Sequence, residues 1–266
     1  MLYPQTLSST HVASSQLREV TLLSETRVHP RQHYALFRIA PFAHGQALTF
    51  ATVTFRMLLF EIGGLALTDL IIHSPTNILH EFSPLPGFQQ TLPFVLQNLR
   101  QVVFRLRRED GAGMEPPVVF SPQERNLGPG LLPVSLDVAG ERHVTAGDLQ
   151  LPPHVEVVDP TQTIAHMCSP NARLKLTAQL AYWKGYMGSP EPLNARFAPS
   201  AWKADTPVCI PLQPLFSPVT KANYHITSEG DYESILLEVY TDGSLSPSEA
   251  LGEASVGLKQ LLQPLV

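Results

Sequence analysis

Twenty-five prolines divide this 266-residue chain into short segments. Proline lacks the backbone N–H that helix interiors and central strands require, so this spacing excludes long coiled coils and helical repeats. At roughly 150 residues per domain, the length allows about two domains. The chain is therefore expected to fold into short strands and a few short helices.

The charge content limits the function classes that are open to the chain. Charged residues make up 15% of the sequence, against roughly 25% in an average soluble protein, which excludes disorder driven by net charge. The formal net charge is −5. Because binding to phosphates requires clustered positive charge, we expect any contact with DNA to be indirect.

The most apolar window covers residues 50–72 and is interrupted by Arg56, Glu61 and Asp69. Three charges in a would-be span favour a buried or interfacial helix, so no membrane contact is expected. Two isolated cysteines, Cys168 and Cys209, indicate a reducing compartment. Residues 1–16 contain no Lys or Arg and no apolar core, which is typical of neither a secretory signal nor a transit peptide. If the protein works in an organelle, we expect it to be made there.

Two helices carry the strongest apolar patterns. Residues 49–62 are apolar around nearly the whole predicted helix, which is typical of a helix in a subunit interface. Gly63 and Gly64 are expected to end it. Near the C terminus, Ser246-Pro247-Ser248-Glu249 combines an N-cap serine, proline at the first helical position and a capping-box glutamate. The helix that follows places on one face Leu251, Ala254, Leu258, Leu261 and Leu262.

Other segments are shorter. Strands are predicted at residues 34–39, 65–72, 134–138, 155–158, 172–182 and 234–240. A second amphipathic helix is predicted from the spacing of Leu92, Val95, Leu96, Leu99 and Val103. Two long Pro/Gly-rich loops cover residues 108–130 and 188–207, a length typical of functional or mobile loops.

No catalytic motif is present. The sequence has no phosphate-binding glycine loop, dinucleotide fingerprint, nucleophile elbow or helical histidine pair. His80-Glu81 starts like a zinc protease motif, but Pro84 stands where the second histidine is required. His166 and Cys168 lack further metal ligands at suitable spacing. We expect no catalytic residue, metal site or cofactor in this chain.

Four segments, taken in order, resemble the N-terminal assembly region of the alpha subunit of bacterial-type multisubunit DNA-dependent RNA polymerase. The first runs from Gly45-Gln46-Ala47 to Arg56, where the family has an Arg-Arg pair and this chain has Phe55-Arg56. The others are Leu79-His80-Glu81-Phe82-Ser83 with Leu96-Gln97-Asn98-Leu99-Arg100, then Val144-Thr145-Ala146-Gly147-Asp148 with Leu151-Pro152-Pro153, and finally Phe216-Ser217-Pro218-Val219 with residues 236–251. Gly45-Gln46-Ala47, Leu151-Pro152-Pro153 and Ala254-Ser255 are most similar to plastid members.

The resemblance implies an α+β fold with two domains. Residues 1–63 and 219–266 would form a discontinuous dimerisation domain, and residues 64–218 an inserted, mainly β domain that contacts the large subunits. The C-terminal DNA-binding domain of most relatives is expected to be absent. The implied function is that of a non-catalytic scaffold in plastid (chloroplast) transcription. It would dimerise and recruit the beta and beta-prime-type subunits, and it would be an enzyme only as part of this nucleotidyltransferase. The catalytic Mg²⁺ is expected in the large subunit.

The resemblance also implies site residues. Arg56 matches the family arginine that binds the beta-type subunit, and Arg100 and Leu212 fall where the beta-prime-type subunit is contacted. The expected homodimer interface comprises Phe50, Val53, Met57, Phe60, Leu251, Leu258 and Leu262.

Two alternatives stay open at this stage. One is a stand-alone β-rich hydrolase that uses His80 and Glu81 together with Asp148. The other is a degenerate alpha subunit that no longer assembles.

Overall fold

The protein is described by a computed structural model over residues 19–73, 80–107, 132–186 and 209–265. Its two ends meet in one antiparallel sheet of order β1-β2-β13-β12. The strands are β1 (Glu19–His29), β2 (Gln32–Phe42), β12 (Val219–Glu229) and β13 (Tyr232–Thr241). Strand β2 pairs with β13, Phe37 opposite Leu237. Segments some 200 residues apart in the sequence are therefore joined by backbone hydrogen bonds.

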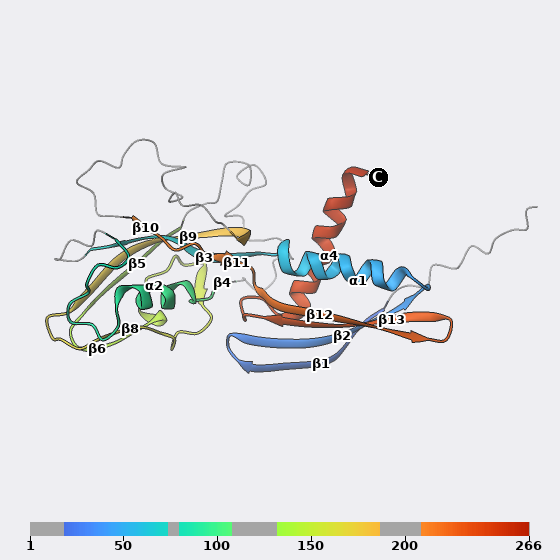
Figure 1. Cartoon of the computed structure of the whole chain (residues 1–266), viewed down its shortest axis with the longest axis horizontal. Coiled ribbons are helices and arrows are strands. Elements are labelled where there is room, and N and C mark those ends of the chain that lie inside the picture. The colour runs from blue at the N-terminus through green and yellow to red at the C-terminus, as the bar shows by residue number, and fades with distance from the viewer. Residues whose placement is uncertain (1–18, 74–79, 108–131, 187–208, 266) are drawn as a thin grey trace, which may run out of the picture.

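Two helices, α1 (Gln46–Phe60) and α4 (Pro247–Leu262), cover one face of this sheet, and the short helix η3 (Gln263–Leu265) follows α4. Figure 1 shows α4 crossing α1, so that its C-terminal half projects away from the sheet. We call these strands and helices the α1/α4 unit. Its core includes Ala35, Phe37, Ile39, Phe42, Ala47, Ala51, Met57, Leu58, Ile235, Leu237, Val239, Ala250 and Ala254.

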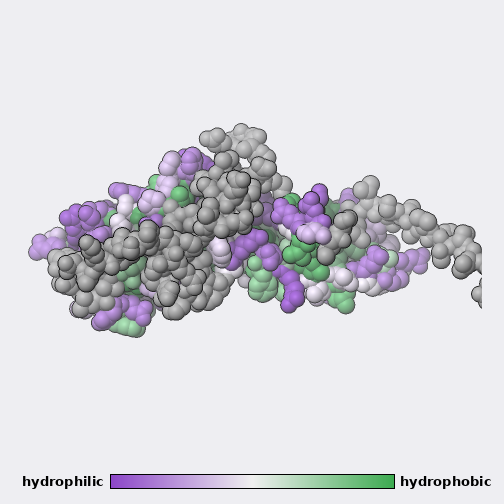
Figure 2. Space-filling view, turned by 90° about the horizontal axis from the view of Figure 1, so that it is seen from above, coloured by the Kyte–Doolittle hydropathy of each residue, from purple (hydrophilic) through white to green (hydrophobic). Residues whose placement is uncertain are grey.

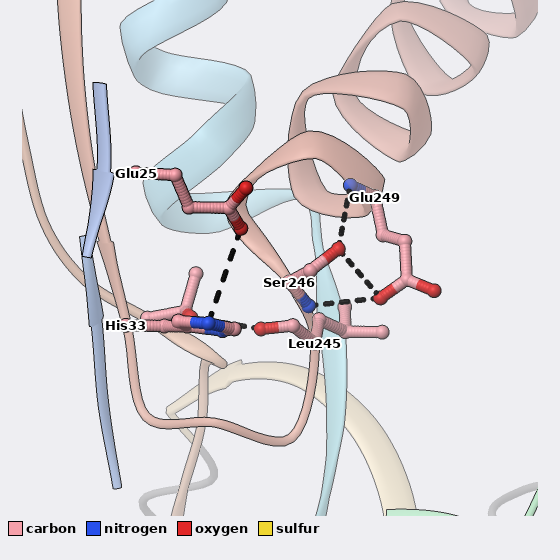
Figure 3. Close-up of polar contacts among 6 residues, drawn as sticks. Glu25, His33, Leu245, Ser246 and Glu249 are labelled. Atoms are coloured by element: carbon pink, nitrogen blue, oxygen red, sulfur yellow. Dashed lines mark hydrogen bonds and ion pairs between the residues drawn. The ribbon is translucent and has the colours of Figure 1, made fainter. Parts of the chain in front are cut away.

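Helix α4 begins where the sequence predicts. The backbone N–H of Glu249 donates to Ser246 Oγ at 3.2 Å, and Glu249 Oε2 accepts from the Ser246 N–H at 2.8 Å. Figure 3 shows this capping box beside the Glu25–His33 pair, whose Oε1 and Nε2 atoms lie 3.9 Å apart. The box satisfies backbone donors that would otherwise be unpaired at the helix start.

Between α1 and β12 lies a second unit, the inserted unit. Its main sheet has the order β11-β9-β3-β4-β7, with β10 paired to β3 and β5 to β9. These strands are β3 (Gly63–Ile72), β4 (Phe104–Leu106), β5 (Leu132–Ala139), β7 (Val155–Val157), β9 (Arg173–Tyr186), β10 (Cys209–Pro211) and β11 (Leu215–Phe216). A two-stranded sheet pairs β6 (Arg142–Thr145) with β8 (Thr163–Met167), and η2 spans Ala146–Asp148.

Helix α2 (Leu92–Arg100) packs against β8 and β3 and buries Leu92, Val95, Leu96 and Leu99. The core of the inserted unit is separate from that of the α1/α4 unit. It includes Leu70, Phe104, Val134, Leu136, Val144, Ile164, Met167, Leu174, Leu176, Leu180 and Leu212. Every buried member of this core lies within residues 67–212, whereas the other core draws on residues 35–62 and 219–254.

The α+β class predicted from the sequence is confirmed, and so are the six predicted strands. Three of the predicted helix ends are wrong: the start and the end of α1, and the end of α2. Helix α1 begins at Gln46 rather than at residue 49, and it ends at Phe60, so that Gly63 and Gly64 belong to β3. Helix α2 ends at Arg100, which leaves Val103 outside it. The predicted loops 108–130 and 188–207 lie outside the described residues.

The helices of the described chain are all too short, or too polar, to cross a lipid bilayer.

Replacing Ser246 by Ala removes the Oγ acceptor for the Glu249 N–H. We expect the free energy of unfolding to fall by about 1 kcal/mol, the usual value of an N-cap side chain. Urea titration followed by circular dichroism measures this change. Ser228→Ala, at an exposed position of β12, is the control and should leave the midpoint unchanged; equal losses in both variants would contradict the role of the cap.

Candidate subunit interface

A carboxylate on the sheet holds the start of α1. Gly45, with φ of 81°, precedes the helix and offers no side-chain cap. Glu233, at the start of β13, accepts instead from the Gly45 N–H at 3.0 Å and from the Ala47 N–H at 3.3 Å. The Gly45 hydrogen bond, followed by those from Ala47 and His44, lowers the pKa of Glu233 against a smaller opposing effect of burial. The negative charge also suits the positive end of the helix dipole, so α1 is fixed to the sheet at this point.

Helix α1 presents Arg56 on its exposed side. Its neighbour Phe55 points into the unit, where its ring packs edge-on against Tyr224 with centroids 5.9 Å apart. Arg56 has no hydrogen-bond or ion-pair partner among the residues that the structure describes. Its guanidinium is thus available as a planar set of donors for an external acceptor.

A groove of about 260 Å³ lies where α1 and α4 cross. Gly257 of α4 lies against Met57 of α1 at this crossing: a Cβ at this position would lie 3.0 Å from Met57 Cε. Figure 2, seen from the side to which α4 projects, shows hydrophobic residues exposed on the α1/α4 unit. The groove is lined by Phe50, Thr54, Ala254, Ser255, Leu258, Lys259 and Leu262.

The seven predicted dimer residues fall into three groups. Met57 and Leu251 are buried in the core of their own chain. Phe50, Val53 and Leu258 are half-buried and pack against that core. Phe60 is 62% exposed and Leu262 is 47% exposed. Leu261, which precedes Leu262 in the sequence, is 60% exposed. The exposed residues are the ones that a second molecule could cover.

The two residues predicted to contact the beta-prime-type subunit differ in accessibility. Arg100 is exposed at the end of α2 and has no hydrogen-bond or ion-pair partner in the described part of the chain. Leu212 follows β10 and is completely buried, and its N–H donates to Thr68 O at 2.8 Å. The structure does not bring Arg56, Arg100 and Leu212 into contact through any described interaction, so they do not form one site.

The residues considered for a hydrolase are engaged in separate local turns. His80 Nδ1 accepts from the Phe82 N–H at 3.1 Å, and Ser83 Oγ accepts from the His80 N–H at 3.2 Å. Asp148 accepts from Arg142 Nη2 at 2.6 Å and from the Thr145 N–H at 2.8 Å. No described hydrogen bond or ion pair joins His80 or Glu81 to Asp148. This arrangement offers no catalytic group made of the three residues.

One histidine pair is brought together that the sequence did not predict. His143 of β6 stacks on His166 of β8, with ring centroids 3.9 Å apart and planes within 2°. Parallel rings point their nitrogen lone pairs in parallel directions, so they cannot converge on one metal ion without rotating. Cys168 Sγ lies 3.8 Å from His166 Nδ1. Over the residues that the structure covers, no group of three or more His, Cys, Asp or Glu side chains could hold a metal ion.

Comparison with known proteins finds relatives of both the inserted unit and the chain as a whole. Residues 70–192, most of the inserted unit, match the family described as the RNA polymerase Rpb3/RpoA insert domain. The chain is 34% identical over 235 residues to the DNA-directed RNA polymerase subunit alpha of Helianthus annuus, covering 88% of this chain and 60% of the relative. It is 35% identical over 238 residues to that of Spinacia oleracea, covering 88% and 61%. Residues 70–192 thus carry the RNA polymerase insert domain, and most of the chain is similar to DNA-directed RNA polymerase alpha subunits.

The chain spans about 60% of the length of these family members. The alpha subunit of Cuscuta reflexa shows the same relation, with 34% identity over 239 residues and 61% of its length covered. The shared region therefore includes the inserted unit and most of the α1/α4 unit of this alpha-subunit homologue.

Two residues that help to place α1 and α4 were not predicted from the sequence. Glu233 caps a helix 186 residues earlier in the chain, and no local pattern signals a partner at such a distance. Gly257 lies inside α4, where glycine is less stable than alanine. A glycine in the middle of a predicted helix could therefore have indicated that another element packs against it, as Met57 does.

Replacing Glu233 by Gln should lower the melting temperature at about pH 7 by weakening the anchor of α1. Because the folded-state pKa lies below the ordinary value of 4.5, the stabilisation by the carboxylate is present above that value. It is lost as the pH falls through the folded-state pKa. The difference between Glu233→Gln and the unmodified chain should therefore shrink towards about pH 3.

Differential scanning fluorimetry across this pH range measures the effect. Glu141→Gln, at an exposed turn between β5 and β6, is the matched control and should follow the unmodified chain at every pH. A Glu233→Gln deficit that stays constant down to the lowest pH would contradict a role for the charge.

Proposed function

We propose that this chain is a non-catalytic scaffold subunit of a plastid RNA polymerase. In this proposal, two copies pair through the α1/α4 surface, and the dimer then recruits the beta and beta-prime-type subunits. The exposed apolar end of α4 is the observation that carries the proposal. The similarity to alpha subunits and the plant origin of those subunits support it.

The α1/α4 surface has the composition expected of a homodimer interface. The buried faces of both helices combine alanines with Met57, Leu58 and Leu251. Three further large apolar side chains near the ends of the helices remain exposed, namely Phe60, Leu261 and Leu262. Fully burying a leucine or phenylalanine stabilises an association by roughly 1.5 to 3 kcal/mol. In a two-fold dimer each such residue is buried twice, so even this small set favours pairing before the entropy of association is subtracted.

The proposed recruitment of the large subunits uses the two arginines. Arg56 on α1 would donate to acceptors of the beta-type subunit, and Arg100 at the end of α2 would contact the beta-prime-type subunit. Leu212 would act through the packing of the inserted unit, because its side chain is completely buried.

The remaining parts of the proposal follow from the same assignment. The chain would contribute to nucleotidyl transfer only as a subunit, with the catalytic Mg²⁺ held by a large subunit and with no cofactor of its own. Contact with DNA would be indirect, through the assembled polymerase. The place of action would be the plastid, since the similar subunits come from plants.

Introducing charge at the end of α4 should prevent pairing. We expect the unmodified chain to run as a dimer, twice its mass of 29.3 kDa, and Leu262→Asp to run as a monomer, because a carboxylate cannot be buried in an apolar interface without a partner. Size-exclusion chromatography with light scattering measures the mass. Leu215→Asp, in a side chain of the inserted unit that is 66% exposed, is the matched control and should leave the dimer intact. An unmodified chain that stays monomeric would contradict the proposed pairing.

Arg56→Ala should keep the dimer and lose the beta-type subunit. The reason is that alanine removes the donors but no buried apolar surface. Co-expression of tagged chain with both cognate large subunits, followed by purification on the tag, measures retention of each subunit.

Arg27→Ala, at an exposed arginine of β1, is the control and should retain both large subunits. Retention of the beta-type subunit by Arg56→Ala would refute the role of Arg56. An unmodified dimer that retains neither large subunit would instead support a degenerate, non-assembling alpha subunit.

A further inference from the structure

The turn between β1 and β2, residues 30–31, lies at the junction of the two units. Figure 1 shows it at the end of the four-stranded sheet that faces the inserted unit. Strand β1 ends at His29 and β2 begins at Gln32, so Pro30 and Arg31 form the tip of the hairpin. Neither the pairing of copies nor the contacts with large subunits proposed above involves this tip.

Three chain segments meet at the tip. Gly243, in the turn after β13, has φ of 88°, and a Cβ built at this position would overlap the carbonyl oxygen of Pro30. The same Cβ would lie 3.1 Å from Val158 Cγ1. Val158 follows β7 and belongs to the inserted unit, where its N–H donates to Val103 O at 3.0 Å. The hairpin tip, the β13–α4 turn and the inserted unit are therefore packed together without space for one more carbon atom.

The tip lies near two carboxylates, each of which is held by the turn that contains it. Asp159 of the inserted unit is buried, and it accepts from the Thr161 Oγ1–H at 2.6 Å and from the Thr161 N–H at 3.1 Å. Asp242 of the α1/α4 unit is held in the same way by Ser244, at 2.6 and 2.9 Å. His29 Nε2 lies 3.9 Å from Asp159 Oδ2.

The charge of Arg31 acts on both carboxylates. The pKa of Asp159 is lowered by the hydrogen bonds from Thr161 and further by the charges of His29 and Arg31. Burial raises the pKa of Asp242, and the Arg31 charge is among the influences that oppose this rise. Arg31 is thus close enough to influence a carboxylate of each unit, and its Nε atom is buried at the junction.

The covalent connections between the units are confined to one place. The chain crosses from α1 to β3 and returns from β11 to β12, and the two crossings are in contact: a Cβ on Gly64 would lie 3.4 Å from the backbone of Phe216. Ser217 Oγ donates to Leu59 O at 3.3 Å in the same region. Two adjacent crossings form a single hinge, and hinges of this kind permit domain motion unless another contact opposes it.

We propose that the hairpin tip is a clasp that fixes the orientation of the inserted unit relative to the α1/α4 unit, through the close packing at Gly243, the approach of His29 to Asp159 and the buried Nε atom of Arg31 beside Pro30. The clasp sets the distance between the exposed side of α1 and the end of α2, and hence between Arg56 and Arg100. Its use in assembly rests on the proposed function, whereas the clasp itself is a property of the isolated chain.

A distance measurement between the two units tests the clasp. Cys168 is exposed on the inserted unit and takes one nitroxide label, and Asp231→Cys, in the exposed β12–β13 turn, takes the other. Burial raises the pKa of the Cys209 thiol to about 11, which makes it a poor nucleophile; Cys209→Ala removes it. Double electron–electron resonance is recorded on the full chain with an excess of unlabelled chain, so that a second copy contributes no spin pair.

The parent should give one narrow distance distribution. Gly243→Ala should broaden and shift it, because the new methyl group displaces the tip. Gly140→Ala is the matched control: Gly140 has nearly the same φ, 89°, but nothing within 4 Å of an added Cβ. It introduces the same backbone strain away from the junction and should leave the distribution unchanged.

Arg31→Ala keeps the proposal testable should Gly243→Ala fail to fold, because it deletes only the charge and stem of a half-buried turn residue. It should also broaden the distribution while the circular dichroism spectrum stays that of the parent. A folded Arg31→Ala chain with the narrow parent distribution, or equal broadening in Gly140→Ala, would overturn the clasp. Because no large subunit takes part, failure here is distinct from failure of the proposed scaffold function.

Discussion

The crossing of α1 over α4 is the contact on which the architecture of this protein depends. The two helices share one core over the sheet, to which both contribute alanines, and Gly257 of α4 lies against Met57 of α1. Interaxial distances between helices are set by the side chains at the contact. A close crossing leaves only one half of α4 covered by its own chain, and the other half projects with its leucines exposed. The apolar surface that the sequence concentrates near its C terminus is therefore divided between an internal core and an external face.

The elements predicted from the sequence are those with local signals. The Ser246–Glu249 box and the spacing of Leu92, Val95, Leu96 and Leu99 are local patterns, and both elements form as predicted. The start of α1 was misplaced because its cap, Glu233, comes from a distant strand, so that Gly45 carries no recognisable N-cap side chain. Strand β1 was not predicted at all. It is exposed on both faces, so its sequence lacks the alternation that marks a half-buried strand.

The resemblance gives positions for the proposed site residues but not the exposure of their side chains. Arg56 and Arg100 were identified by resemblance, and both side chains are exposed. Leu212 was identified in the same way, yet it is completely buried, because a match of positions carries no information on the direction of a side chain. Helical spacing likewise grouped Leu251 with Leu262 on one apolar face. In the structure, Leu251 lies in the half of α4 that packs on the sheet and α1, whereas Leu262 lies in the half that projects beyond them.

Strand β1 has a further consequence for how copies of this chain meet. It forms the outer edge of the four-stranded sheet, where exposed strands can act as templates for sheet extension. Charged residues Glu19, Glu25 and Arg27 punctuate it, and its pairing with β2 is interrupted at two irregularities. Charges and bulges of this kind discourage edge-to-edge stacking and fibril growth. Pairing of another strand with the backbone of β1 is thereby discouraged, although four apolar side chains remain exposed on the faces of this strand, namely Val20, Leu22, Leu23 and Val28.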